Sequence, residues 1–120
     1  MIAVIFEVTP ADDRRSAYLD LAAQLHMRLN EIDGFLSIER FESLQMPGKI
    51  LSLSFWRDEA AIATWRNGRE HRAAQQVGRN GTFADYRLRI AGVIRDYGMT
   101  EREEAPQDSR EFHATSEQTQ

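Results

Sequence analysis

Apolar side chains recur along this chain with two different periods, one typical of strands and one typical of helices. The strand-like alternation occurs in four stretches: residues 2–9, 35–42, 50–56 and 86–97. A proline-glycine turn between the second and third stretches predicts that they form a hairpin. In the first stretch both alternating sets are largely apolar, so both faces of that strand are expected to be covered.

The segments between these strands have the period of amphipathic helices. One helix of about five turns is expected after Thr9-Pro10, which would supply a cap and a first-turn proline. Its apolar face repeats at helical spacing through Tyr18, Leu21, Ala22, Leu25 and Leu29. After the third strand, Asp58 is expected to cap a short helix. Asn67-Gly68 then interrupts the pattern, and a second short helix opens at His71.

The order strand, helix, strand, strand, helix pair, strand predicts an α+β fold of ferredoxin-like type. In that arrangement a four-stranded antiparallel sheet carries its helices on one face. We expect the open face to carry Trp56 together with apolar residues of the first strand. Because an apolar face of this kind is normally buried, a homodimer is expected, with two sheets packed face to face as a dimeric α+β barrel.

Composition narrows the possible functions. At 120 residues the chain is expected to form one domain, and it has no cysteine for a disulfide, a thiolate metal site or a nucleophile. Its net charge of −4 arises within residues 99–120, an acidic polar tail expected to be flexible, outside the domain formed by residues 1–98. That domain is neutral overall, which argues against nucleic acid as a partner. The apolar start is too short for a membrane span, so a cytoplasmic location without a membrane partner is expected.

The order of elements, together with one continuous motif, resembles the antibiotic biosynthesis monooxygenase family. The motif, SFWRDEAAIATWRNGREHRAAQQVGR, joins a strand ending in Trp56 to two short helices, and Asp33-Gly34-Phe35 precedes it. This resemblance covers residues 1–98 and implies the fold of dimeric α+β barrels. It also implies a monooxygenase, because the family includes oxygenases of phenolic, quinol or polyketide substrates that need no cofactor. Haem-degrading enzymes and proteins without known activity belong to it as well.

For the branch without a cofactor, the resemblance implies a pocket, a base and groups that steady a substrate anion. Trp65 would form a wall of this pocket and His71 would be the base, with dioxygen and a small aromatic or quinol-like molecule as reactants. Arg69 or Arg72 could stabilise the anion. The remaining residues implied at the substrate site are Trp56, Asn67 and Gln75.

The haem-degrading branch remains an alternative, as does a barrel that binds a ligand without catalysis. Trp65 lies where the haem-degrading branch has a tryptophan, but Gln75 occupies the place of its proximal histidine, and an amide is a poor iron ligand. Simpler readings of the same residues also stay open. Trp65 could be a core residue, His71 a solvated surface histidine and Asn67 a helix cap, while Glu7 could pair with an arginine or act as a buried base.

Overall fold

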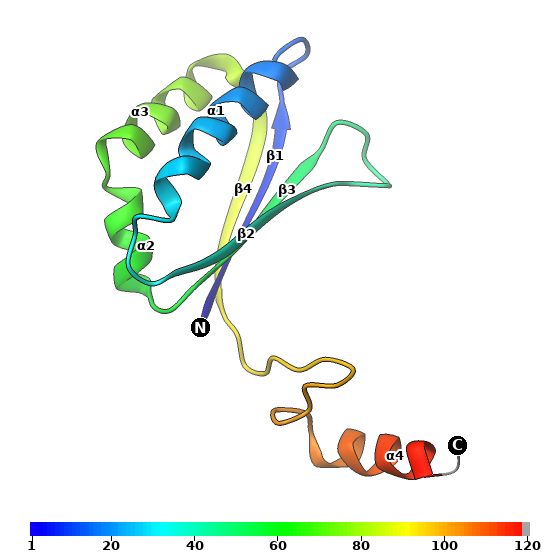
Figure 1. Cartoon of the computed structure of the whole chain (residues 1–120). Helices are drawn as coiled ribbons and strands as arrows, with labels where there is room; N and C mark the ends of the chain where they lie inside the picture. The colour runs from blue at the N-terminus through cyan, green and yellow to red at the C-terminus, as the bar shows by residue number, and fades with distance from the viewer. Residues whose placement is uncertain (119–120) are drawn as a thin grey trace.

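The computed structural model describes residues 1–118, apart from the side chains of residues 69, 70, 77, 78, 80 and 115–118. It consists of a four-stranded sheet with three helices on one face, followed by a separate C-terminal helix (Figure 1). In chain order the elements are β1 (Ile2–Pro10), α1 (Arg15–Leu29), β2 (Phe35–Glu42), β3 (Ile50–Trp56), α2 (Glu59–Arg66), α3 (Arg69–Val77), the π-helical turn η1 (Gly78–Thr82), β4 (Phe83–Gly92) and α4 (Gln107–Gln118).

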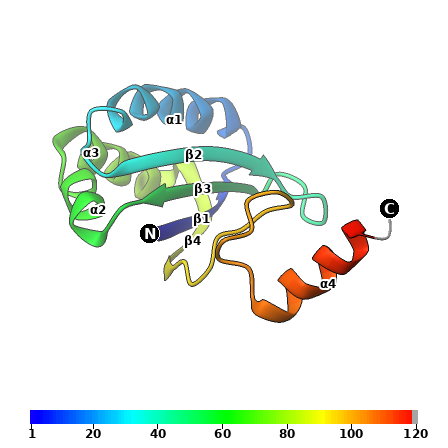
Figure 2. The same ribbon diagram turned by 60° about the horizontal axis from the view of Figure 1, so that its bottom comes forward.

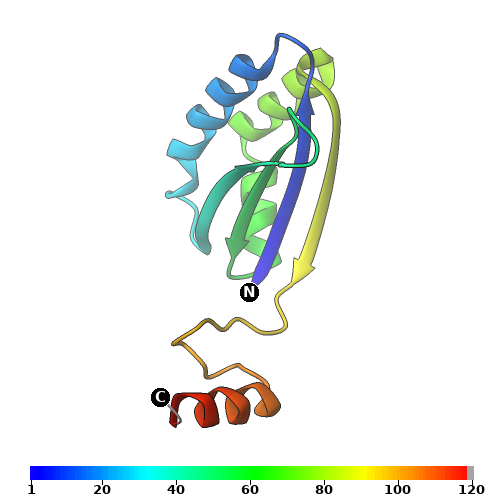
Figure 3. The ribbon, with the colours of Figure 1, turned by 90° about the vertical axis from the view of Figure 1, so that its right-hand side faces the viewer.

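All neighbouring strands of the sheet are antiparallel, and their order is β2-β3-β1-β4. The central strand β1 places Val4 opposite Ser54 of β3 and Ile90 of β4. Figure 3 shows the sheet from its open side, with the helices behind it and β4 at one edge. The predicted α+β, ferredoxin-like fold is therefore confirmed.

Two clusters of buried side chains fill the space between the sheet and its helices. One contains Val8, Tyr18, Ala22 and Ile50; the other contains Leu29, Trp56, Ala61 and Ile62. Partly buried Ile2 and Val4 pack against the second cluster, so this set of β1 side chains faces the helices.

The expectation that Trp56 lies on the open face is wrong. Trp56 is opposite Ile2, is only 2% exposed, and donates from Nε1 to Ser54 Oγ at 2.9 Å within the core. Side chains alternate along a strand, so the open face carries the other set. From the two central strands that set comprises Ala3, Ile5, Glu7, Leu51, Leu53 and Phe55.

The ends of three elements also differ from the prediction. β1 continues through Pro10, whose backbone is the last to pair with β4, so this proline does not open a helix. The helix starts at Arg15 instead, after Arg14, which makes no side-chain cap. Strand β4 begins at Phe83 and ends at Gly92, earlier than the expected end at Tyr97.

The connection between α1 and β2 lies against the start of α2. Gly34, at φ +96°, accepts a hydrogen bond from Arg57 N at 2.7 Å, and a Cβ built on it would lie 2.7 Å from Ala61 Cβ. The Arg57 side chain binds Asp33 at 3.2 Å and Asp58 at 3.0 Å. This close approach fixes the direction in which α2 leaves the sheet.

Candidate functional site

The best-defined polar feature on the helix side is the junction of α2 and α3. Helix α2 begins at Asp58, whose Oδ1 accepts from Ala61 N at 2.9 Å. That backbone hydrogen bond, helped by the one from Arg57, holds the pKa of Asp58 below its usual value. Ala61 and Ile62 are buried, and Trp65 packs from the same helix against the cluster around Trp56. The end of α2 is therefore anchored in the core.

A break of two residues, Asn67 and Gly68, then separates α2 from α3, which continues along the sheet (Figure 1). Asn67 N donates to Ala63 O at 3.0 Å, and Gly68 N donates to Trp65 O at 3.1 Å. The first backbone hydrogen bond of α3 runs from Arg72 N to Gly68 O at 2.9 Å. Across this break His71 lies on Trp65, with ring centroids 4.8 Å apart and an angle of 52° between the planes.

The environment of His71 keeps its imidazole neutral. Burial, together with the positive charges of Arg72 and Arg66, lowers the pKa of His71 from 6.5 to about 4. Its Nδ1 atom is buried and has no hydrogen-bond partner among the residues that the structure describes. An imidazole in this state can accept a proton or a hydrogen bond from a bound molecule.

The predicted polar residues near His71 bind one another. Arg72 donates from Nη2 to Asn67 Oδ1, and from Nη1 to Gln75 Oε1 at 3.4 Å. Arg72 therefore ties the α2–α3 turn to the next turn of α3. The side chain of Arg69 lies outside the described residues. Trp56 reaches the site only indirectly, as the buried support on which Trp65 packs.

Strand β4 adds an apolar strip that the sequence did not single out as part of a site. Tyr86, Leu88 and Ile90 pair with Val8, Phe6 and Val4, so they share the helix-facing side of the sheet. They are nevertheless 41%, 51% and 43% exposed. The signal was present in the alternation of β4, but only the pairing register with β1 shows which alternate set faces the helices. Ile90 of the strip pairs with Val4, and Val4 packs against the same core cluster as Trp65.

One end of this strip is held by polar and aromatic contacts. The hydroxyl of Tyr86 accepts from Arg79 Nη1 at 2.9 Å. The ring of Tyr86 lies 5.9 Å from that of Phe6 and 6.1 Å from that of Phe83. The π-helical turn η1 is thereby fixed to the start of β4, and the phenol of Tyr86 is a second polar group beside the strip.

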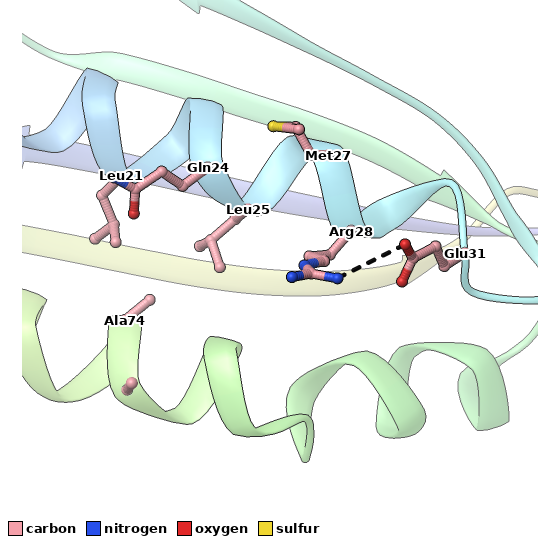
Figure 4. Close-up of a pocket in the computed structure, with 8 residues that line it drawn as sticks. Leu21, Gln24, Leu25, Met27, Arg28, Glu31 and Ala74 are labelled. Atoms are coloured by element: carbon pink, nitrogen blue, oxygen red, sulfur yellow. Dashed lines mark ion pairs between the residues drawn. The ribbon is translucent and has the colours of Figure 1, made fainter.

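A separate groove of about 580 Å³ runs between α1 and α3. Its lining is mainly aliphatic, and an Arg28–Glu31 pair at 3.8 Å stands at one end (Figure 4). The groove is lined by Leu21, Gln24, Leu25, Met27, Arg28, Glu31, Ala73 and Ala74. Because it includes neither Trp65 nor His71, we place the candidate site at the α2–α3 junction and not here.

Among the side chains that the structure describes, no group of three histidine, cysteine or acidic residues is placed to hold a metal ion. None of the helices in the described part of the chain has both the length and the apolar character needed to cross a bilayer.

Residues 1–77 match the model of the family described as antibiotic biosynthesis monooxygenase. A fungal protein from Pyricularia oryzae, named jasmonate monooxygenase ABM, is 47% identical over 93 residues. That alignment covers 78% of this chain but 43% of the relative, so the chain spans less than half of that protein's length. An uncharacterised Bacillus subtilis protein, YqjZ, is 30% identical over 93 residues, with 78% and 79% of the two chains covered.

Solved structures share the fold at low sequence identity. The Mycobacterium tuberculosis protein Rv0793 superposes with a TM-score of 0.72 at 18% identity, over 81% of this chain and 98% of that one. The Pseudomonas aeruginosa protein PA3566 gives a TM-score of 0.68 at 15% identity, over 78% and 93% of the two chains. About a fifth of this chain therefore has no counterpart in Rv0793.

Proposed function

Because this chain belongs to the antibiotic biosynthesis monooxygenase family, we propose that it is a monooxygenase that needs no prosthetic group. Its substrate would be a small aromatic, quinol or polyketide-type molecule that can be deprotonated next to a carbonyl or a ring. The second reactant would be dioxygen. When an activated CH₂ group becomes a carbonyl, one oxygen atom enters the product and the other leaves as water, so the substrate itself supplies all the electrons.

The contact between Trp65 and His71 is the observation that carries this proposal. The reaction needs a base that is unprotonated before substrate binds, and His71 has a pKa lowered to about 4 and a buried Nδ1 without a partner among the described residues. Such a low pKa makes a weak base in the empty site. A substrate anion forming beside the ring would favour the imidazolium and so raise the pKa of His71 during the proton transfer.

The ring contact of His71 and the exposed apolar area on the helix side of the sheet suit a flat, partly apolar substrate. Trp65 offers an aromatic surface, and the strip of Tyr86, Leu88 and Ile90 offers exposed apolar area on the helix side of β4. The Arg72 guanidinium is one residue from His71 and is held by Asn67 and Gln75, so its charge is fixed near the proposed anion.

Haem degradation is the alternative within the same family, and the residues fit it poorly. Gln75 stands where that branch has an imidazole, and its amide oxygen accepts from Arg72. His71, the nearest imidazole, packs on Trp65. Titration with haemin is the direct test: a Soret shift that saturates at one equivalent would favour the haem alternative over our proposal.

The proposed assembly is a homodimer formed through the open face of the sheet. This face presents Ile5, Leu53 and Phe55 around a charged group in which Glu7 binds Arg89 at 3.2 Å and Lys49 at 3.6 Å. Burial alone would raise the pKa of Glu7, but the hydrogen bond from Arg89 and the charge of Lys49 outweigh it and lower the pKa. Burying a paired carboxylate of this kind under a second sheet costs less free energy than burying an unpaired carboxylate.

The function is tested by oxygen consumption with a panel of quinols, anthrone-type polyketides and jasmonate, the last taken from the name of the fungal relative. Turnover should be lost in His71→Asn and kept in His26→Asn, which changes an exposed histidine of α1. Equal turnover in both variants would contradict the role of His71. The dimer is tested separately by sedimentation: Leu53→Asp should give monomers, whereas Met27→Asp on the outer side of α1 should not.

A further inference from the structure

The chain beyond β4 forms an arm that stands away from its own domain. We use the term C-terminal arm for residues 93–118, which follow the last sheet hydrogen bond, from Val93 N to Met1 O at 3.0 Å. Figures 1 and 2 place α4 beyond the end of the sheet and on the side of the open face. The molecule is 57 Å long, and its radius of gyration is 18.0 Å, against about 14 Å for a compact chain of this length.

The arm has an internal structure of its own. Arg102 donates to Gly98 O at 2.9 Å and to Ser109 Oγ at 2.6 Å, and its guanidinium lies 5.2 Å from the ring centroid of Tyr97. Arg110 Nε donates to Ala105 O at 2.9 Å, and Ala105 is only 6% exposed. These bonds join the turn before α4 to the helix, so the arm has a defined shape of its own.

Among the exposed apolar side chains, two pairs lie at places that are far apart in one chain. In the arm, Ile94 is 86% exposed and Met99 is 93% exposed. At the β2–β3 hairpin, Leu44 is 101% exposed and Met46 is 56% exposed. Figure 1 shows the hairpin and the arm at opposite ends of the sheet. Two apolar groups of this size at opposite ends can cover each other only between copies.

Charge decides how two copies would be oriented. A two-fold axis can stack two sheets face to face with their strands running in the same direction or in opposite directions. The arm contains seven acidic residues and three arginines, for a net charge of −4, so stacking in the same direction would bring two acidic arms together. Residues 43–49 of the hairpin contain one charged side chain, the cation Lys49. Stacking in opposite directions therefore separates the two acidic arms and brings each one to the hairpin of the other copy, where the one charged side chain, Lys49, is paired with Glu7.

We propose that the C-terminal arm of one copy packs against the β2–β3 hairpin of a second copy, with Ile94 and Met99 beside Leu44 and Met46 of the partner. This inference rests on the proposed dimer and adds a contact outside the sheets. The two arms would then hold the two copies together, one arm at each end of the dimer.

Because the chain has no cysteine, single introduced cysteines can test the contact. Full-length Met99→Cys and Leu44→Cys chains, carrying different tags, are produced together and treated with a short bismaleimide. Two residues in contact have an effective concentration near millimolar. The yield of mixed cross-linked dimer from Met99→Cys with Leu44→Cys should therefore exceed the yield from Met99→Cys with Met27→Cys by about tenfold or more. Met27 is a matched control because it is 76% exposed but lies on α1, behind the sheet.

The other outcomes separate the arm contact from the dimer itself. Sedimentation of the full chain can show a dimer while Met99→Cys cross-links equally to Leu44→Cys and to Met27→Cys. In that case the arm proposal is wrong and the dimer stands. If Met99→Cys chains cross-link mainly to each other, the arms lie side by side and the proposed orientation is overturned. A monomer at micromolar concentration would overturn both.

Discussion

The imidazole of His71 lies on the indole of Trp65, with the two ring centroids 4.8 Å apart, although the residues belong to different helices. Asn67 and Gly68 make this contact possible, because they end α2 and start α3 within one turn. Trp65 is in turn packed against the core around Trp56. The position of His71 therefore depends on buried packing and not on its exposed neighbours in the sequence.

The first prediction concerns stability against pH. The pKa of His71 is about 4 in the folded chain and 6.5 in an unfolded one, so between these values the unfolded chain binds more protons. The free energy of unfolding should consequently fall as the pH is lowered from 7 to 4, by at most about 3 kcal/mol from this group. Urea unfolding of wild type and His71→Gln at several pH values measures the difference. The His71→Gln variant should lose this part of the pH dependence, and His26→Gln should keep it.

A second prediction separates the roles of the two rings. With an active substrate, His71→Asn should lower kcat by about 10²–10⁴, the usual contribution of a general base. Trp65→Phe keeps an aromatic wall, so it should mainly raise KM. The kcat/KM of the wild type reports the free enzyme, so it should stay constant from pH 8 to 6 and fall only near pH 4, because His71 is neutral in the empty site at pH 7. A fall in kcat/KM centred at pH 6.5 would instead indicate an exposed histidine.

A third prediction tests the buried support of Trp65. Ser54→Ala removes the acceptor of the Trp56 Nε1 hydrogen bond, which leaves a buried donor unpaired and should cost about 1–3 kcal/mol of stability. Ser52→Ala is the matched control on the same face, because no side-chain hydrogen bond of Ser52 occurs among the described residues. Thermal unfolding of both variants measures the costs. Similar losses would mean that the indole hydrogen bond contributes little.

The fourth prediction concerns the close approach of the α1–β2 connection to α2. Gly34→Ala places an L side chain at φ +96° and a Cβ 2.7 Å from that of Ala61. Gly48→Ala meets a similar φ of +87° with open space around it, so it should cost only the backbone strain of about 1–2 kcal/mol. Denaturant unfolding should show a clearly larger loss for Gly34→Ala. Equal losses would show that Ala61 can move aside without cost.

The sequence alone determined the order and type of the elements of the domain. Alternation identified the four strands, and helical spacing with the Asp58 cap and the Asn67-Gly68 break identified the helix pair. These are local signals, since they depend on the period of the backbone and on hydrogen bonds between near neighbours. The same residues carried the family resemblance, which the match over residues 1–77 confirms.

Only the tertiary structure decided which face each strand turns to the helices. An alternating strand has two faces, and the register with its neighbours determines which one is buried, so Trp56 lies in the core and the strip on β4 borders the helices. Pro10 extends β1 because pairing with β4 continues that far. The neutral state of His71 likewise depends on burial against Trp65 and on two nearby arginines, and the spacing of residues along a chain does not specify burial.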